Sequence, residues 1–470
     1  MGTSARDCLN STNLAVNLLQ DLGFIVNKEK SNLIPTQQVE YLGFVINSKN
    51  MTLSLNQGKI NNIISHCREV LSAHTTSVRD LASLIGKMSA TIQAVFPAPL
   101  FYRHLQLEKI ASLREHYNYE TEVTLSKEAR DELRTWTQYL QAWNGRGIVL
   151  QTPDLTIQTD ASLSGWGACL GNQRVGGRWT PQEKINHINY LEVLAAFYAL
   201  RTLLKDRQNV HVRLQMDNST AISYINHKGG TRSVSLVQLA LKIWLWCLQR
   251  SLILTAEHLP GSMNVTADNL SRVFNDRSEW QLNVRIFRRI MNRLGFSPDV
   301  DLFATRLNTQ LQMFVSWQPD PMAWRVDALL LNWREIKGYA FPPFALLPRC
   351  LSKISEEQAT IVLIAPVWRT QIWYPRLLEM AVQNPVILPR GRDLLQLPHN
   401  RTLVHPLADL MLLAAWKLSG KTFAQREFLS QCPSQSCHHG GTSPRSSMIQ
   451  LGIDGPAGVF RGKQILFEHL

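Results

Sequence analysis

Hydrophobic and polar residues alternate in two short segments near the middle of the chain, Leu155–Asp160 and Val210–Asp217. Alternation with a period of two is typical of a half-buried strand. Other segments repeat their apolar residues every three or four positions, most clearly Val78–Met88 and Lys127–Trp143. This spacing predicts amphipathic helices. The pattern therefore predicts a mostly helical first part and a mixed α/β part after it.

Strand-like segments also occur near the start of the chain. Gly23–Val26 and Tyr41–Ile46 are short apolar runs, separated by the polar stretch Lys28–Ser31 and by Pro35. We expect two short strands here, ahead of the helices.

The region from 280 to 395 alternates between the two patterns. Apolar strand candidates at Val300–Phe303, Tyr339–Phe341 and Ile361–Ala365 are separated by helical stretches. Such alternation favours an α/β sheet. Beyond it we expect one amphipathic helix through His405–Trp416, and a disordered tail from 430 onward because that stretch is rich in Ser, Gly, Pro and His.

Four acidic residues follow this pattern in an informative way. Asp160 and Asp217 end the two alternating runs, Glu192 lies early in an apolar helix, and Asp268 opens another helix. Each of them alone fits a solvated strand end or helix cap. In the order strand, helix, strand, helix they could instead converge, and clustered carboxylates need a cation to offset their repulsion. Hard oxygen ligands suit Mg²⁺ or Mn²⁺.

A histidine precedes the last of these acids. His258 lies ten positions before Asp268, in a loop with Pro260 and Gly261. A histidine beside a metal site can carry a proton during phosphodiester hydrolysis.

These pieces together resemble a type 1 ribonuclease H domain of the kind carried by reverse transcriptases. The resemblance covers 150–275 and rests on Thr159-Asp-Ala-Ser162, Tyr190-Leu-Glu192, Met216-Asp-Asn218 and the segment His258–Asp268. It implies a central mixed sheet flanked by helices. It also implies two Mg²⁺ (or Mn²⁺) ions held by four catalytic acids, Asp160, Glu192, Asp217 and Asp268. The catalytic histidine would be His258. The implied contacts with nucleic acid are Ser162 and Asn218.

Composition changes the picture in two ways. Lys plus Arg is 49 and Asp plus Glu is 36, so the formal charge is 49 − 36 = +13. A basic chain fits a polyanionic partner, although a soluble basic protein without one has the same balance. The seven cysteines are scattered, which is typical of reduced thiols in an intracellular protein, in the nucleus or cytoplasm. We predict no membrane span.

The first part of the chain resembles the end of a reverse transcriptase palm and its thumb. The similar residues are Leu22-Gly-Phe24, Asn27–Ser31, Tyr41-Leu-Gly-Phe44 and Leu84-Ile-Gly-Lys87. The last of these is either a helix packing face or a surface that follows nucleic acid. The paired aspartates of the family's Tyr-x-Asp-Asp turn are missing, so we predict no polymerase activity.

The third region resembles the phage-type adenine methyltransferase domain of DIRS-type retroelements. The similar residues are Asp299–Ala304, Phe341-Pro-Pro-Phe344 and Ile364–Trp368. In the family the Pro-Pro-aromatic motif begins with Asn or Asp, which accepts a hydrogen bond from the target amine. Phe341 cannot accept one, so we predict a degenerate domain without methyl transfer.

The order of these parts resembles a reverse transcriptase/ribonuclease H fragment of a DIRS-type (tyrosine-recombinase) retrotransposon. We expect a multidomain α/β protein with a palm end and helical thumb-like region at 1–145, a ribonuclease H-like domain at 150–275, a methyltransferase-like domain at 280–395, and a helix with a tail at 396–470. The implied activity is endonucleolytic hydrolysis of the RNA strand of RNA–DNA hybrids, with DNA and RNA as partners. The alternative is a non-catalytic nucleic-acid-binding remnant of a decayed element.

Overall fold

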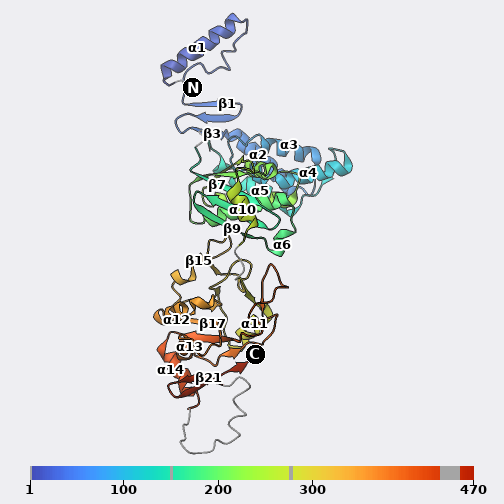
Figure 1. The fold of residues 1–470 in the computed structure, drawn as a ribbon. Coiled ribbons are helices and arrows are strands. Elements are labelled where there is room, and N and C mark those ends of the chain that lie inside the picture. Colours follow the sequence, from blue (N-terminus) through green and yellow to red (C-terminus); the bar gives the residue numbers. More distant parts are fainter. Residues whose placement is uncertain (1–2, 149–151, 275–278, 435–455) are drawn as a thin grey trace, which may run out of the picture. The chain divides into compact units, whose positions relative to one another are not determined.

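The computed structural model describes residues 3–148, 152–274, 279–434 and 456–470. The chain divides into two compact units, which are described separately. The first comprises Met1–Thr156 and Arg207–Leu259, and the second comprises Ile157–Asp206 and Pro260–Leu470. Figure 1 shows the elements of both. Helices and sheets both contribute throughout, so the predicted mixed α/β class is confirmed.

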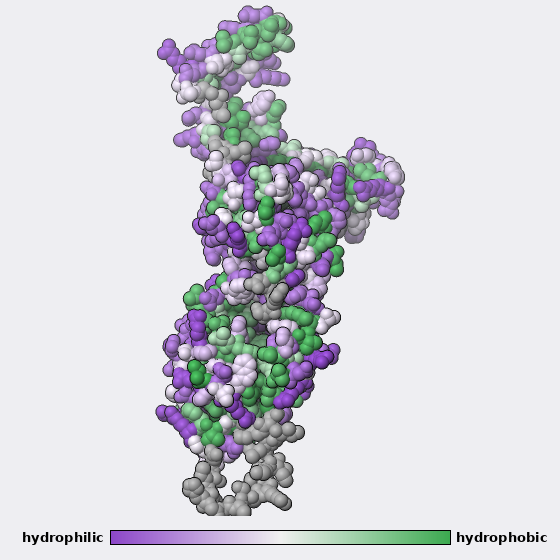
Figure 2. Space-filling model, in the orientation of Figure 1, coloured by the Kyte–Doolittle hydropathy of each residue, from purple (hydrophilic) through white to green (hydrophobic). Residues whose placement is uncertain are grey.

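The first unit begins with helix α1 (Ala5–Asp21), which the alternation pattern did not predict. None of its residues is buried, and several leucines of the helix are exposed. Figure 2 shows this hydrophobic surface over α1 at the top of the view. Gly23 follows the helix with a φ of 86°, a conformation that ends helices, and the predicted strand at Gly23–Val26 does not form.

A small antiparallel sheet follows, in the order β1-β2-β3-β6: β1 (Gln38–Tyr41), β2 (Phe44–Asn47), β3 (Thr52–Leu55) and β6 (Arg146–Gly147). The predicted strand Tyr41–Ile46 is therefore divided by a turn. Leu42 and Gly43 both have positive φ angles, 50° and 76°. Two positive φ angles are the requirement of a two-residue type I′ hairpin turn, which gives strands their native twist.

Four helices form the core beside this sheet: α2 (Gln57–Ser72), α3 (Val78–Ser89), α4 (Arg103–His116) and α5 (Lys127–Trp143). The predicted helices at 78–88 and 127–143 are confirmed. Asn56, Ser77 and Ser126 cap α2, α3 and α5 by accepting a backbone N–H of the first turn. Leu84 and Ile85 pack in this core, whereas Gly86 is exposed, and a contact of the Leu84–Lys87 segment with nucleic acid stays a prediction.

A mixed sheet follows in the chain, with the strand order β11-β10-β7-β8-β9. Strand β7 (Leu155–Ala161), whose last five residues belong to the second unit, is antiparallel to β8 (Gly165–Leu170), and β8 is antiparallel to β9 (Gln173–Arg178). In the first unit β10 (His211–Met216) and β11 (Ile253–His258) are parallel. The central mixed sheet expected within 150–275 is thus present.

Helices accompany the strands of each unit. The second unit contributes α6 (Pro181–Lys184), α7 (Ile188–Leu203) and α10 (Val265–Arg272), and the first contributes α8 (Ser219–Asn226) and α9 (Val234–Leu248). Glycines let α10 approach the sheet closely. A Cβ on Gly167 of β8 would lie 2.3 Å from the carbonyl oxygen of Ala267, so only glycine permits this packing.

The rest of the second unit is an α/β region whose sheet has the order β13-β16-β17-β20-β18-β23. Strands β13 (Val300–Asp301), β16 (Lys337–Ala340) and β17 (Thr360–Pro366) are parallel, as βα alternation predicted. Helices α11 (Val284–Arg293), α12 (Leu347–Glu356) and α13 (Tyr374–Met380) belong to this region.

The predicted helix through His405–Trp416 is wrong. Its apolar half is strand β20 (Leu413–Ser419), antiparallel to β17 and to β18 (Val386–Ile387). Six of its seven residues are buried, because a central strand is covered on both faces. Such a strand is a continuous apolar run, which periodicity alone does not distinguish from a buried helix.

The tail is also more ordered than predicted. Strands β21 (Pro456–Phe460) and β22 (Lys463–Leu466) and edge strand β23 (Glu468–His469) lie within the stretch expected to be disordered, whereas helix α14 (Thr422–Gln431) lies mostly before it. Residues 435–455 lie outside the described residues. Among the described helices, none combines the length and the apolar character that crossing a bilayer requires.

Candidate metal centre

Asp160 is the sixth residue of β7 and is buried, with 5% of its surface exposed. The hydroxyl of Ser271 donates a hydrogen bond of 2.8 Å to its Oδ2. Ser271 lies on α10, so this bond ties the carboxylate to the helix that packs on β8. One oxygen of a buried carboxylate is thereby held in a defined position.

Glu192 lies in the second turn of α7 and is equally buried, at 4% exposed. The helix is apolar on most of its surface, and its residues on both sides of Glu192, Leu191 and Val193, are buried as well. His187 caps its start, because Nδ1 accepts the backbone N–H of Asn189 at 3.1 Å. An acid in so apolar a helix is costly to ionise unless a cation lies near it.

Asp217 directly follows the last residue of β10 and is exposed. Asn218 comes next and caps α8, since its Oδ1 accepts the backbone N–H of Ala221 at 2.9 Å. The strand end and the helix start thus fix the backbone on both sides of Asp217.

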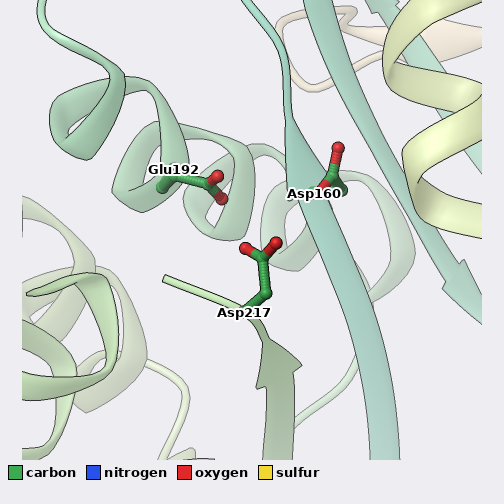
Figure 3. A group of neighbouring side chains, drawn as sticks. All are labelled: Asp160, Glu192 and Asp217. Atoms are coloured by element: carbon green, nitrogen blue, oxygen red, sulfur yellow. The ribbon is translucent and has the colours of Figure 1, made fainter. Parts of the chain in front are cut away.

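The structure brings three of the four predicted acids together. Asp160, Glu192 and Asp217 each offer a carboxylate oxygen within 4.8 Å of the other two. Figure 3 shows the three side chains around a common space, from β7, from α7 and from the end of β10. Because all three donors are carboxylate oxygens and two are buried, the set fits a hard divalent cation such as Mg²⁺ or Mn²⁺.

The fourth predicted ligand, Asp268, is placed differently. Its Oδ1 lies 2.7 Å from both Nε and Nη2 of Arg272, one turn later on α10, and its side chain is 42% exposed. It is not in the group of three. A link to that group does exist, because the Ser271 hydroxyl lies 2.8 Å from the Asp268 carbonyl oxygen as well as from Asp160 Oδ2.

His258 ends β11 and is exposed. The parallel register of the first unit pairs it with Met216, the residue just before Asp217. The imidazole therefore belongs to the same sheet edge as Asp217, where a proton carrier for the site would be needed. Its catalytic role stays a prediction.

The two predicted nucleic-acid contacts have structural partners. The Ser162 hydroxyl is buried; it donates to the Ser271 carbonyl at 2.7 Å and accepts the N–H groups of Ser164 and Gly165. Its placement supports a role in the β7–β8 turn, and a contact of Ser162 with nucleic acid stays a prediction. Asn218 is the helix cap described above, and a contact through it stays a prediction.

Ser271 is the residue of the site that sequence reasoning missed. The available signal was its spacing: it lies three residues after Asp268, on the same side of one helix. Nothing in the sequence alone indicates that this hydroxyl contacts Asp160, because the two residues are 111 positions apart.

The α/β region of the second unit contains a separate cavity of about 750 Å³. Phe341, Pro342, Pro343 and Phe344 line it, together with Phe303 after β13. Phe341 offers the cavity an aromatic ring and no hydrogen-bond acceptor, as the sequence implied. The absence of methyl transfer stays a prediction.

No family model matches the sequence, and no curated protein matches it. Among solved structures, the chain is similar to a foamy viral protease–reverse transcriptase in complex with an RNA/DNA hybrid, with 14% identity, a TM-score of 0.29, and 60% of this chain and 37% of that one covered. A complex of the foamy viral enzyme with double-stranded DNA gives 15% identity, a TM-score of 0.28, and coverage of 55% and 44%. The chain thus spans less than half the length of these viral proteins.

A smaller protein matches over most of its own length. Ribonuclease H1 from the archaeon Halobacterium salinarum is 18% identical, with a TM-score of 0.20, and the match covers 25% of this chain and 92% of that one. Since these TM-scores are all below 0.5, the function proposed below rests on the carboxylates.

Proposed function

We propose that this protein is a metal-dependent endonuclease of the ribonuclease H type, which hydrolyses the RNA strand of RNA–DNA hybrids as part of a DIRS-type reverse transcriptase. The observation that carries the proposal is the convergence of Asp160, Glu192 and Asp217, within 4.8 Å of one another. Three carboxylates so close, two of them buried, repel strongly without a cation.

In this proposal Asp160, Glu192 and Asp217 would hold the divalent ions, and Asp268 would be a further ligand. Bound ions would stabilise the attacking and leaving oxygens of an in-line phosphoryl displacement. Ser271 keeps one oxygen of Asp160 oriented. His258, at the same sheet edge as Asp217, would move a proton during product release.

Asp268 must leave Arg272 to act as a ligand. The two are an exposed pair, four residues apart on α10. Exposed pairs of this kind contribute only about 0–1 kcal/mol, so exchanging Arg272 for a metal ion costs little. The formal charge of +13 supports binding to the phosphate backbone, and contacts with 2′-hydroxyls would distinguish RNA from DNA.

The second hypothesis is a nucleic-acid-binding remnant without catalysis. The pairing of Asp268 with Arg272 favours it, because that carboxylate is already neutralised. The phenylalanine at 341 favours it too, as a sign of decay elsewhere in the chain.

Cleavage of a labelled hybrid by the full chain decides between them. We expect Mg²⁺-dependent shortening of the RNA strand, an intact DNA strand, and no cutting of double-stranded DNA. Asp160→Asn should abolish the cutting, whereas Glu335→Gln, the same chemical change at an exposed acid outside the site, should not. An uncut hybrid, or equal cutting by the Asp160→Asn variant, would favour the remnant.

A further inference from the structure

Three basic side chains converge in the first unit. Arg103 begins α4, Arg146 lies in β6, and Lys228 follows α8 by two residues. The Lys228 ammonium lies 4.2 Å from the ring centroid of Phe96 and 4.8 Å from that of Trp244. The Arg146 guanidinium lies 5.6 Å from the same Phe96 ring. The Arg103 guanidinium lies 5.3 Å from the ring centroid of Tyr102, so each of the three cations has an aromatic face beside it.

The three cations repel one another. Burial, and then the charges of Arg146 and Arg103, lower the pKa of Lys228 to about 8. Burial likewise lowers the pKa of Arg103. Like charges brought together in this way destabilise each other unless an anion joins them. The cluster is thus the opposite, in sign, of the carboxylate group.

None of the three forms an ion pair within the described part of the chain. Arg103 donates to the Gln106 side chain at 2.8 Å and to the His227 carbonyl at 2.6 Å, and its buried Nε has no acceptor. Arg146 makes one long hydrogen bond, of 3.4 Å, to the Ile92 carbonyl. Lys228 is nine-tenths buried, and its contacts there are the two rings. Donor capacity therefore remains at the cluster.

The backbone at Lys228 is also unusual. Its φ is +53°, in the left-handed region, where a residue other than glycine is uncommon. Glycine would adopt this conformation at lower cost, and two glycines follow immediately. Binding of an anion by the Lys228 ammonium would explain why a lysine occupies this position in place of glycine.

We propose that a phosphodiester group of the bound nucleic acid occupies the space where Arg103, Arg146 and Lys228 converge. This inference rests on the proposed function in one respect, that a nucleic acid is the ligand. A phosphate would relieve the mutual repulsion and accept hydrogen bonds from the two partly exposed guanidinium groups, whose planar N–H groups suit it. Lys228, held by Phe96 and Trp244, would add its positive charge.

Helix α8 sets the separation between this cluster and Asp217. Helix α8 starts two residues after Asp217 and ends two residues before Lys228. Its eight residues span about 12 Å, at about 1.5 Å per residue. A strand rises about 3.4 Å per nucleotide, so the cluster would hold a phosphate about three to four nucleotides from the one at Asp217.

The salt dependence of binding tests the proposal. Affinity of the full chain for a labelled RNA–DNA hybrid is measured in EDTA, so that no cutting occurs, over a range of KCl concentrations. Each lost phosphate contact should reduce the slope of log K against log salt by about 0.9. We expect that reduction for Arg146→Gln and for Lys228→Gln, and about twice as much for the double variant.

Arg134→Gln is the matched control, because Arg134 is an exposed arginine of the same unit that pairs with Asp131. It should leave the slope unchanged. Slopes equal to that of the parent chain in both test variants would overturn the proposal, and the cation–π contacts would then only stabilise the fold. A parent chain that does not bind the hybrid would overturn the proposal as well. Arg146 is only partly buried, so its variant tests the slope even if the Lys228 variant unfolds.

The two failures can be told apart. Reduced slopes in a chain that never cuts the hybrid would support the phosphate site and count against the nuclease. Cutting with unchanged slopes would do the reverse.

Discussion

His258 is paired in register with the residue before Asp217, so its imidazole is close to the chemistry without being needed to assemble the metal ligands. We predict that His258→Ala lowers turnover of the hybrid about 10²-fold, the low end for a positioned proton carrier, with metal affinity nearly unchanged. Turnover and Mn²⁺ affinity, measured on the same preparation, check this. A collapse of metal binding would instead make His258 a ligand.

Asp301, the last residue of β13 in the second unit, is a buried acid. Burial raises its pKa to about 7, against hydrogen bonds from the backbone N–H groups of Gln310 and Phe303. The folded state therefore binds more protons than the unfolded state between about pH 4 and 7, and stability must fall as pH rises through that window. A shift of this size corresponds to about 4 kcal/mol at most, at about 1.4 kcal/mol per pKa unit.

We predict that Asp301→Asn removes most of this pH dependence, because the amide keeps the size of the side chain and cannot ionise. Urea unfolding at pH 5 and pH 8 measures it. Asp299→Asn, two residues earlier and exposed, is the control and should keep the wild-type pH dependence. Equal pH dependence in the Asp301→Asn variant would mean that another group dominates this window.

At the scale of elements, one buried ion pair joins α6 to the segment after β13 within the second unit. Arg306 Nη1 lies 2.8 Å from Glu183 Oε2, and the two side chains are only 7% and 17% exposed. The guanidinium also covers the ring of Tyr198, on α7, at 4.9 Å. Burial opposes ionisation of Glu183, yet Arg306 and the Tyr198 hydroxyl keep its pKa lowered.

Breaking this pair should therefore be expensive. Arg306→Leu leaves a buried carboxylate without its cation, and we predict a loss of about 3–5 kcal/mol in the free energy of unfolding. Arg376→Leu removes an exposed arginine paired with Glu379 and should cost less than about 1 kcal/mol. Denaturant titration of both variants measures the difference, and similar losses would show that the Arg306 pair carries no special weight.

The elements also show what the sequence could predict. Helix α3 and helix α5 were predicted because one face of each is apolar at helical spacing. The convergence of Asp160, Glu192 and Asp217 followed from their places at strand ends and in a helix. The Arg306–Glu183 pair could not be predicted, because it joins residues 123 positions apart whose local sequences contain no sign of each other. Strand β20 was missed because its apolar run has no period.

An ion pair within one helix explains why Asp268 is not in the group of three carboxylates. Asp268 was predicted as a ligand from its order after His258, and that role stays a prediction. Arg272 lies four residues after Asp268, on the same side of α10. Its guanidinium therefore pairs with the Asp268 carboxylate. A sequence pattern identifies which acids belong together, whereas competition between neighbouring partners is decided by side-chain geometry.

At the scale of the whole molecule, we predict that the chain has no palm metal site. In the described residues before the first sheet, the aspartates are Asp7 and Asp21, near opposite ends of α1. Fourteen positions along a helix correspond to about 21 Å, too far apart to share an ion. We predict no primer extension by the 470-residue chain with template, nucleotides and Mg²⁺. Templated extension in a gel assay would reveal a polymerase site elsewhere in the molecule.

Binding of Mn²⁺, followed by calorimetry on the full chain without nucleic acid, tests the metal centre most directly. Wild type and Glu335→Gln should bind the ion with the same affinity, because Glu335 is exposed and outside the group of three. Glu192→Gln should lose most of that affinity while unfolding at the same temperature or slightly higher, since one of three repelling carboxylates is gone. Undiminished Mn²⁺ binding by Glu192→Gln would contradict the assignment of Asp160, Glu192 and Asp217 as a metal centre.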